Sequence, residues 1–242
     1  MADEKPKNLD LLGIEPIAKS FEKVTNSTVD GAAAILSRIC LPVAEEIGLL
    51  LRDRVRYWRA MNIAKLTVDA EHKINALGIG PDFQAHPRIV YRIIEEGSWT
   101  DDEDIQEMWS GLLASSCSPE GQDDSNLIFI QLLTNMSRIQ ARLLNVACEQ
   151  AVKKLSASGL IIAEHLEFTL IKLQEITDES DIHRLDREMD HLRSLELIRG
   201  GFNLNTVDQV DVTPSALALH MYARCKGFRD SPVEFYNLIP AM

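Results

Sequence analysis

The sequence lacks the motifs by which many enzymes are recognised. No P-loop, G-x-G-x-x-G, G-x-S-x-G or H-E-x-x-H pattern occurs in its 242 residues. Serine, cysteine and histidine are present, but no spacing among them suggests a nucleophile and its base. Since such pairs assemble in space, the missing motifs weigh only weakly against catalysis. We predict no catalytic residue and no cofactor.

Cysteine is scarce, and its placement excludes the usual metal-binding patterns. The four cysteines, Cys40, Cys117, Cys148 and Cys225, lie far apart. No C-x-x-C pair occurs, and no histidine lies at ligand spacing from any of them. We therefore expect reduced, mostly buried thiols and no metal site.

Positive charge and long apolar runs are lacking as well. The net charge of −12 repels phosphate backbones and acidic lipids. No stretch reaches the roughly 18 charge-free apolar residues that a membrane span requires, and Met1–Asp10 has no apolar region typical of a signal peptide. We expect a cytoplasmic protein without a membrane span. A nucleic-acid partner is disfavoured by the net charge and would need a local basic patch.

Apolar residues recur at intervals of three and four over most of the chain, which predicts amphipathic helices. The first helical segment extends to about Leu77, a length on the order of 50 Å, with a kink or a new helix start at Pro42. Its apolar face from Ile35 to Trp58 favours a homo-oligomer, with a dimer as the first expectation. Further helices are expected at about 87–96, after 100, at 126–136 and at 137–155, with capping boxes at Thr100–Glu103 and Ser137–Gln140.

The pattern changes after Ser156. Helices at about 163–176 and from Ile182 on precede short strand-like pieces at 197–199 and 209–212, and Thr213-Pro214 is expected to begin a last helix. This order is typical of a winged-helix module. We predict an all-α fold, mainly a helical bundle with a long N-terminal helix, plus a small C-terminal winged-helix-like module. The predicted parts are a mobile arm (1–30), a helical domain (31–155) and the module (156–242).

Three segments carry a family resemblance. Residues Ile93–Ala114 combine an apolar helix, a small-residue turn, an acidic cluster and the pattern W-x-x-L-L-A. Upstream, Pro42–Arg59 has a P-x-A-x-E-x-G helix with a basic continuation, and Leu132–Leu144 is similar to L-x-x-L-S-x-x-x-A-x-L-L. Together they resemble the abortive infection alpha (Abi-alpha) family of bacterial phage-defence proteins, over about Ala33–Val146. The resemblance implies a role in abortive infection, in which an infected cell stops growing before the phage matures.

Two groups of residues stand out within the segments that resemble the family. Trp109, Leu112 and Leu113 lie on one face of the signature helix, and we interpret them as core anchors. Arg52, Arg56 and Arg59 share another helical face. They could bind an acidic partner, or they could form a solvated face paired with nearby carboxylates.

The acidic run Asp101, Asp102, Glu103, Asp104 and Glu107 suggests a metal or acid–base site at first sight. Carboxylates in a first helical turn are stabilised by the helix dipole, and the run contains no histidine, so capping is the preferred interpretation.

Two functions of different classes follow. The first is a phage-defence protein that acts through contacts with a host or phage protein and with copies of itself. The second is a winged-helix transcriptional regulator of a defence locus. The second hypothesis has the weaker support, because the helix that would enter DNA, from Ile182 on, lies in a segment with more acidic than basic residues.

Overall fold

The structure is a computed structural model, and it describes residues 56–76, 83–203 and 206–238. About 58% of these residues are helical, and the strands among them form small antiparallel sheets. The prediction of a mainly helical protein is therefore confirmed. The arm at 1–30, the break at Pro42 and most of the Ile35–Trp58 face lie outside the described residues.

The chain divides into two compact units. The first runs to Thr134 and takes in Cys225–Gly227, and the second comprises Asn135–Arg224 and resumes at Phe228. The boundary predicted near Ser156 lies within the second unit. The helix that begins after Ser137 therefore belongs with the C-terminal elements.

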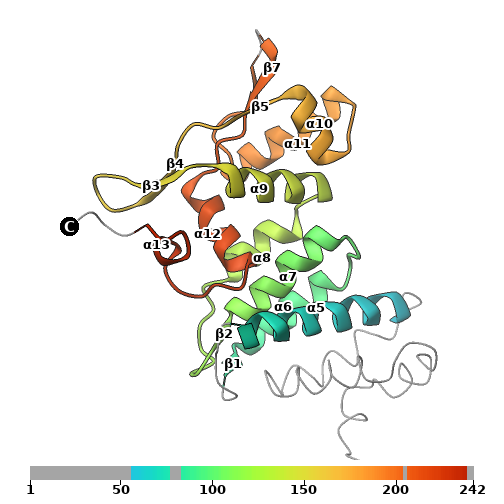
Figure 1. Cartoon of the computed structure of the whole chain (residues 1–242). Coiled ribbons are helices and arrows are strands. Elements are labelled where there is room, and N and C mark those ends of the chain that lie inside the picture. Colours follow the sequence, from blue (N-terminus) through green and yellow to red (C-terminus); the bar gives the residue numbers. More distant parts are fainter. Residues whose placement is uncertain (1–55, 77–82, 204–205, 239–242) are drawn as a thin grey trace, which may run out of the picture. The chain divides into compact units, whose positions relative to one another are not determined.

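The first unit is built from helices and one short ribbon (Figure 1). Its elements are α5 (Arg56–Ala76), β1 (Gln84–Ala85), α6 (Pro87–Gly97), α7 (Glu103–Ser115), β2 (Cys117–Ser118) and α8 (Leu127–Thr134). Strands β1 and β2 pair antiparallel, with Ala85 opposite Cys117. As predicted, His86-Pro87 opens α6: the His86 side chain accepts a hydrogen bond from the backbone N–H of Arg88.

Helices α5, α6 and α7 supply the core of the first unit. Trp109 is 2% exposed, and Leu112 and Leu113 are fully buried. On α6, the three- and four-residue spacing of the buried apolar residues keeps one face against its neighbours. The largest fully buried side chains around Trp109 are Leu66, Ile74, Ile89, Ile93 and Ile94.

Helix α8 is less buried than its apolar sequence predicts. Phe129, Ile130 and Leu133 face the core, but Ile128 is 51% exposed and Gln131 is exposed. The expected buried centre of the bundle is therefore a helix with one covered face.

The second unit mixes helices with two small sheets (Figure 1). Its elements are α9 (Arg138–Gln150), β3 (Lys153–Leu155), β4 (Ile161–Ala163), β5 (Glu167–Thr169), α10 (Leu170–Thr177), α11 (Ile182–Ser194), β6 (Phe202–Asn203), β7 (Thr206–Asp211), α12 (Ala216–Cys225) and α13 (Pro232–Phe235).

Helix α9 begins where the sequence predicts and ends earlier. Ser137 and Gln140 form the predicted capping box. The helix was expected to reach Leu155, but it stops at Gln150 because Lys153–Leu155 pairs with Ile161–Ala163 in an antiparallel hairpin. Strand pairing replaces the last predicted helical turn.

The three-stranded sheet has the order β5-β7-β6. Strand β5 and helix α10 occupy the segment predicted as one helix from about 163, and Thr169 caps α10 through a bond from the N–H of Lys172. β structure was expected only between about Leu197 and Val212. That expectation was wrong, because the five strands β1 to β5 all lie before Leu197.

The start of α12 differs from the predicted Thr213-Pro214 cap. Ser215 fills that role, since its Oγ accepts the N–H of Ala218 at 3.1 Å. Pro214 instead forms an isolated bridge with Ile198. Thr213 Oγ1 accepts the N–H of Leu166 at 2.9 Å and so ties the segment before β5 to the end of β7.

Candidate protein-contact site

The loop between α6 and α7 forms the centre of the signature segment. Gly97 is the last residue of helix α6, and Ser98 is its C-cap. Gly97 therefore does not act as the cap itself. Gly97 is needed for a different reason. A Cβ on Gly97 would lie 2.6 Å from Leu66 Cδ1 and 3.1 Å from Trp109 Cγ, so the absence of a side chain lets α6 approach α5 and α7.

Ser98 is fully buried and organises this loop. Its Oγ accepts from Arg59 Nε at 2.9 Å and donates to the Glu95 carbonyl at 2.7 Å. Its carbonyl accepts from Asn62 Nδ2 at 3.0 Å. Two side chains from α5 therefore fix the backbone and the side chain of one loop residue.

Trp99 follows directly and stacks on a side chain of α5. The guanidinium carbon of Arg59 lies 4.2 Å from the centroid of the Trp99 ring, which is cation–π geometry. Arg59 is 4% exposed, whereas Trp99 is 50% exposed. The indole is therefore anchored by a buried cation and remains open to a partner.

A second tryptophan from α5 reaches the same loop. Trp58 Nε1 donates to Asp101 Oδ2 at 3.2 Å. Gln106, fully buried on α7, donates through Nε2 to the carbonyls of Gly97 and Thr100. Its Oε1 has no hydrogen-bond partner within the described part of the chain. These bonds fix the loop at both ends.

The acidic run is used for capping and surface ion pairs. Asp102 caps α7, with its Oδ1 accepting the N–H of Ile105 at 3.2 Å, so the predicted Thr100–Glu103 capping box is wrong by two residues. Thr100 Oγ1 accepts the N–H of Asp102 instead. Within the described residues, no group of three or more His, Cys, Asp or Glu side chains could hold a metal ion.

The three arginines of the predicted basic patch have different placements. Arg52 lies outside the described residues, and Arg56 is the first residue of α5, without a described side chain. Arg59 is committed to Ser98 and Trp99 inside the fold. Partner binding by Arg52 and Arg56 stays a prediction.

The site has the properties of a protein-binding anchor. Tryptophan is enriched among the residues that dominate binding energy, because it buries a large apolar area and has few rotatable bonds. The fixed position of Trp99 reduces the entropy lost on binding. The sequence analysis interpreted Trp109 as a core residue and did not single out Trp99. The sequence did carry a signal for Trp99, because this tryptophan lies in an expected loop and not on a periodic apolar helix face.

A second group of side chains, in the other unit, surrounds the buried thiol of Cys148. Burial raises the pKa of the fully buried Cys148 thiol to about 12 and also raises the pKa of Tyr236, while desolvation lowers the pKa of Lys153. Lys153 Nζ donates to the Glu149 carbonyl at 2.9 Å and lies 5.1 Å from the centroid of the Tyr236 ring. Since the thiolate is the reactive form, Cys148 is an inert core group.

The described cysteines are buried, and the two histidines of α11 lie at or near the surface. Cys117, Cys148 and Cys225 are buried free thiols, as predicted. His183 is exposed near the start of α11, and the Nδ1 of His191 lies 2.8 Å from Gln140 Nε2. Over the described ranges, no helix combines the length and apolarity needed to cross a membrane.

Fold and site together describe a mainly helical protein with an anchored, exposed tryptophan between two helices. A model of the family described as abortive infection alpha matches residues 59–219, about two thirds of the chain. The chain belongs to the abortive infection alpha family. No curated protein and no solved structure matches it significantly.

The family match begins later and ends later than the sequence resemblance. We expected about Ala33–Val146, but the match starts at residue 59, so it leaves out almost all of the Pro42–Arg59 segment. At the other end it continues to residue 219 and so includes most of the second unit.

Proposed function

We propose that this protein protects a bacterial population against phage by abortive infection, and that it does so by contacting a host or phage protein through Trp99. Family membership supports the defence role. The observation that supports the contact is the exposed indole on a buried arginine, inside the signature segment. No chemical step is part of the proposal.

The proposal includes self-association, with a dimer as the working unit, and a cytoplasmic location. Free buried cysteines agree with a reducing compartment. A protein that responds to phage components inside the cell needs its partners in the same compartment.

A plaque assay with matched variants tests the contact. Trp99→Ala should abolish or strongly reduce protection, while Trp99→Phe should retain part of it. The control is Ile128→Ala, which truncates a side chain of similar exposure in the same unit. Each variant must reach wild-type expression and thermal stability. Full protection by a folded Trp99→Ala protein would refute the proposed contact.

A second function is favoured by one observation. Apart from the β3–β4 hairpin inserted between α9 and β5, the order α9, β5, α10, α11, β6, β7 and the sheet order β5-β7-β6 are typical of a winged-helix module, which supports a transcriptional regulator as the alternative. Against it, the arginines of α11 pair with carboxylates: Arg184 with Glu179, Arg187 with Glu188, and Arg193 with Asp190. A helix with internally balanced charges attracts phosphates weakly.

A gel-shift assay separates the two functions. With DNA from the neighbouring promoter, the contact proposal expects no shift beyond that with unrelated DNA of equal length. A specific shift that Arg184→Ala or Arg187→Ala weakens would favour the regulator.

A further inference from the structure

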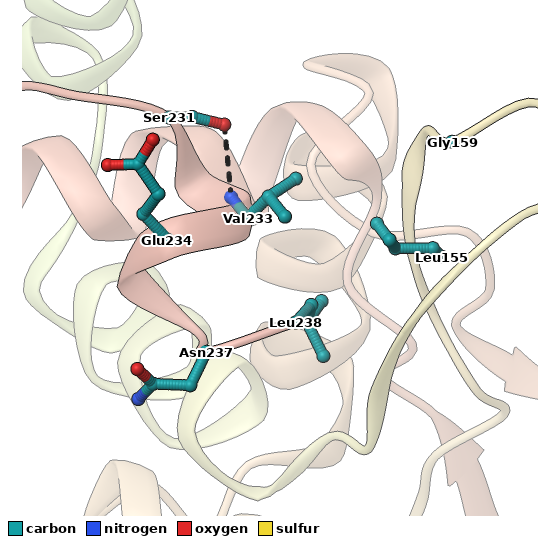
Figure 2. A pocket seen from close by; sticks show the side chains of 7 residues that line it. All are labelled: Leu155, Gly159, Ser231, Val233, Glu234, Asn237 and Leu238. Atoms are coloured by element: carbon teal, nitrogen blue, oxygen red, sulfur yellow. Dashed lines mark hydrogen bonds between the residues drawn. The ribbon is translucent and has the colours of Figure 1, made fainter. Parts of the chain in front are cut away.

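The second unit has a groove that lies apart in sequence from the proposed contact site at Trp99. It lies between the β3–β4 hairpin and the segment around α13 and has a volume of about 580 Å³. Its lining residues are Leu155, Gly159, Ser231, Val233, Glu234, Asn237 and Leu238. Figure 2 shows Val233 and Leu155 facing the open space from opposite sides, while the Glu234 carboxylate points away from it. The groove is apolar inside and acidic at its rim.

The hairpin that forms one wall also carries a projecting apolar side chain. Leu160 is 67% exposed and follows Gly159, which lines the groove. Its position is fixed: Leu160 N–H donates to Ser156 Oγ at 3.1 Å, and the Leu160 carbonyl accepts from the Ser156 N–H at 2.8 Å. An exposed leucine on a rigid turn loses little conformational entropy on binding.

We propose that a second copy of this chain occupies the groove, with Leu160 of each copy inserted between Leu155 and Val233 of the other. A projection and a groove on the same small surface satisfy the self-complementarity that a two-fold contact requires. This inference rests on the proposed dimer and assigns it a surface, separate from the predicted Ile35–Trp58 seam.

Charge supports a second copy as the occupant. The chain carries a net charge of −12, so most of its surface repels another copy. From Ala151 to Ala163 the only charged residues are Lys153 and Lys154, and from Ser231 to Leu238 the only one is Glu234. Lys154 is already paired with Glu164 at 3.0 Å, so this surface is close to neutral, and two copies can meet here with little of the repulsion that the rest of the chain causes.

Sedimentation analysis of three variants of the full chain tests the inference. Leu160→Asp removes the projection and Val233→Lys blocks the groove. Each should raise the dimer dissociation constant at least about tenfold, because a charged group is poorly accommodated in an apolar contact. Ile171→Asp is the control, since Ile171 is 69% exposed and belongs to α10, outside the groove. It should sediment like the wild type.

Mixing the two variants gives the decisive measurement. Neither variant has an intact contact with a copy of itself, but the Val233→Lys copy retains Leu160 and the Leu160→Asp copy retains the groove. In the mixed pair the other contact sets an aspartate at position 160 against a lysine at position 233, which are opposite charges. Their mixture should therefore recover part of the association, with one intact contact per pair. A wild-type dimer that both variants leave unchanged, or a mixture that recovers nothing, would overturn this inference and leave the proposed dimer standing. A wild-type monomer would overturn both.

Discussion

The guanidinium of Arg59 lies 4.2 Å from the Trp99 ring and donates a hydrogen bond to the neighbouring Ser98. One buried cation from α5 thus sets both the loop backbone and the orientation of an exposed indole. The cation compensates for its burial through these contacts, which makes the pair a preorganised unit.

The two tryptophans of the signature should differ sharply in their effect on stability. Trp109→Ala should lower the free energy of unfolding by about 3 to 5 kcal/mol, because it leaves a cavity in the core. Trp99→Ala should cost about 1 kcal/mol or less, since half of its side chain is already exposed. Urea unfolding measures both. Equal losses would contradict the assignment of one tryptophan to the core and the other to the surface.

The hydrogen bond from Arg59 to Ser98 can be isolated with a matched serine. Ser98 and Ser110 are both buried, and the Oγ of each donates to the carbonyl three residues before it. Ser98 Oγ also accepts the hydrogen bond from Arg59 Nε. Ser98→Ala should therefore cost about 1 to 3 kcal/mol more than Ser110→Ala in urea unfolding, because it takes an acceptor from a buried guanidinium. Acrylamide should also quench tryptophan fluorescence more strongly in Ser98→Ala. Equal stability of the two variants would show that the Arg59 bond contributes nothing.

The Asp102 cap should matter for stability and leave phage protection unchanged. Asp102→Ala should cost about 1 kcal/mol, whereas Asp102→Ser should cost little because serine also caps helices well. Plaque assays should show protection close to wild type for both. Loss of protection in a folded Asp102→Ser protein would mean that the carboxylate itself acts in binding or chemistry.

The buried thiol predicts a loss of stability at alkaline pH. Folding raises the pKa of Cys148 from 9.0 to about 12, so between these values the unfolded state releases a proton that the folded state keeps. Stability is unaffected below pH 9 and should fall by up to about 1.4 kcal/mol per pH unit as pH rises toward 12. The raised pKa of Tyr236 adds to the fall at the upper end.

Urea unfolding of the wild type and of Cys148→Ala at a series of pH values measures this effect. The variant should be less stable at neutral pH, because it creates a cavity, and should lose less stability on going from pH 9 to 10. Parallel curves for the two proteins would mean that Cys148 is not the group responsible.

Local sequence rules predicted the features that depend on neighbouring residues. The Ser137–Gln140 box, the start of α6 at His86-Pro87 and the burial of Trp109 all follow from spacing within one turn or one helix face. At the start of α7 the same rule failed. Asp102 and Thr100 both precede the helix, and which of them caps depends on where the chain turns.

Features that depend on distant partners could not be predicted in this way. Arg59 packs against the loop after α6, where it donates to Ser98 and stacks on Trp99. These two partners lie 39 and 40 residues away from it in the sequence. Helix α9 ends at Gln150 because the following residues form β3, which pairs antiparallel with β4. Periodicity showed a helical face in both places, and tertiary contacts decided which residues were covered.

The missing side chain at Gly97 links two positions that are far apart in the chain. Since a Cβ there would lie 2.6 Å from Leu66 Cδ1, alanine at this place requires the Leu66 side chain to move or a smaller residue to replace it. Across the family the two positions should therefore covary, with glycine accompanying leucine and alanine accompanying valine or alanine. An alignment of diverged relatives would carry this packing constraint as a statistical signal, independent of any measurement on this protein.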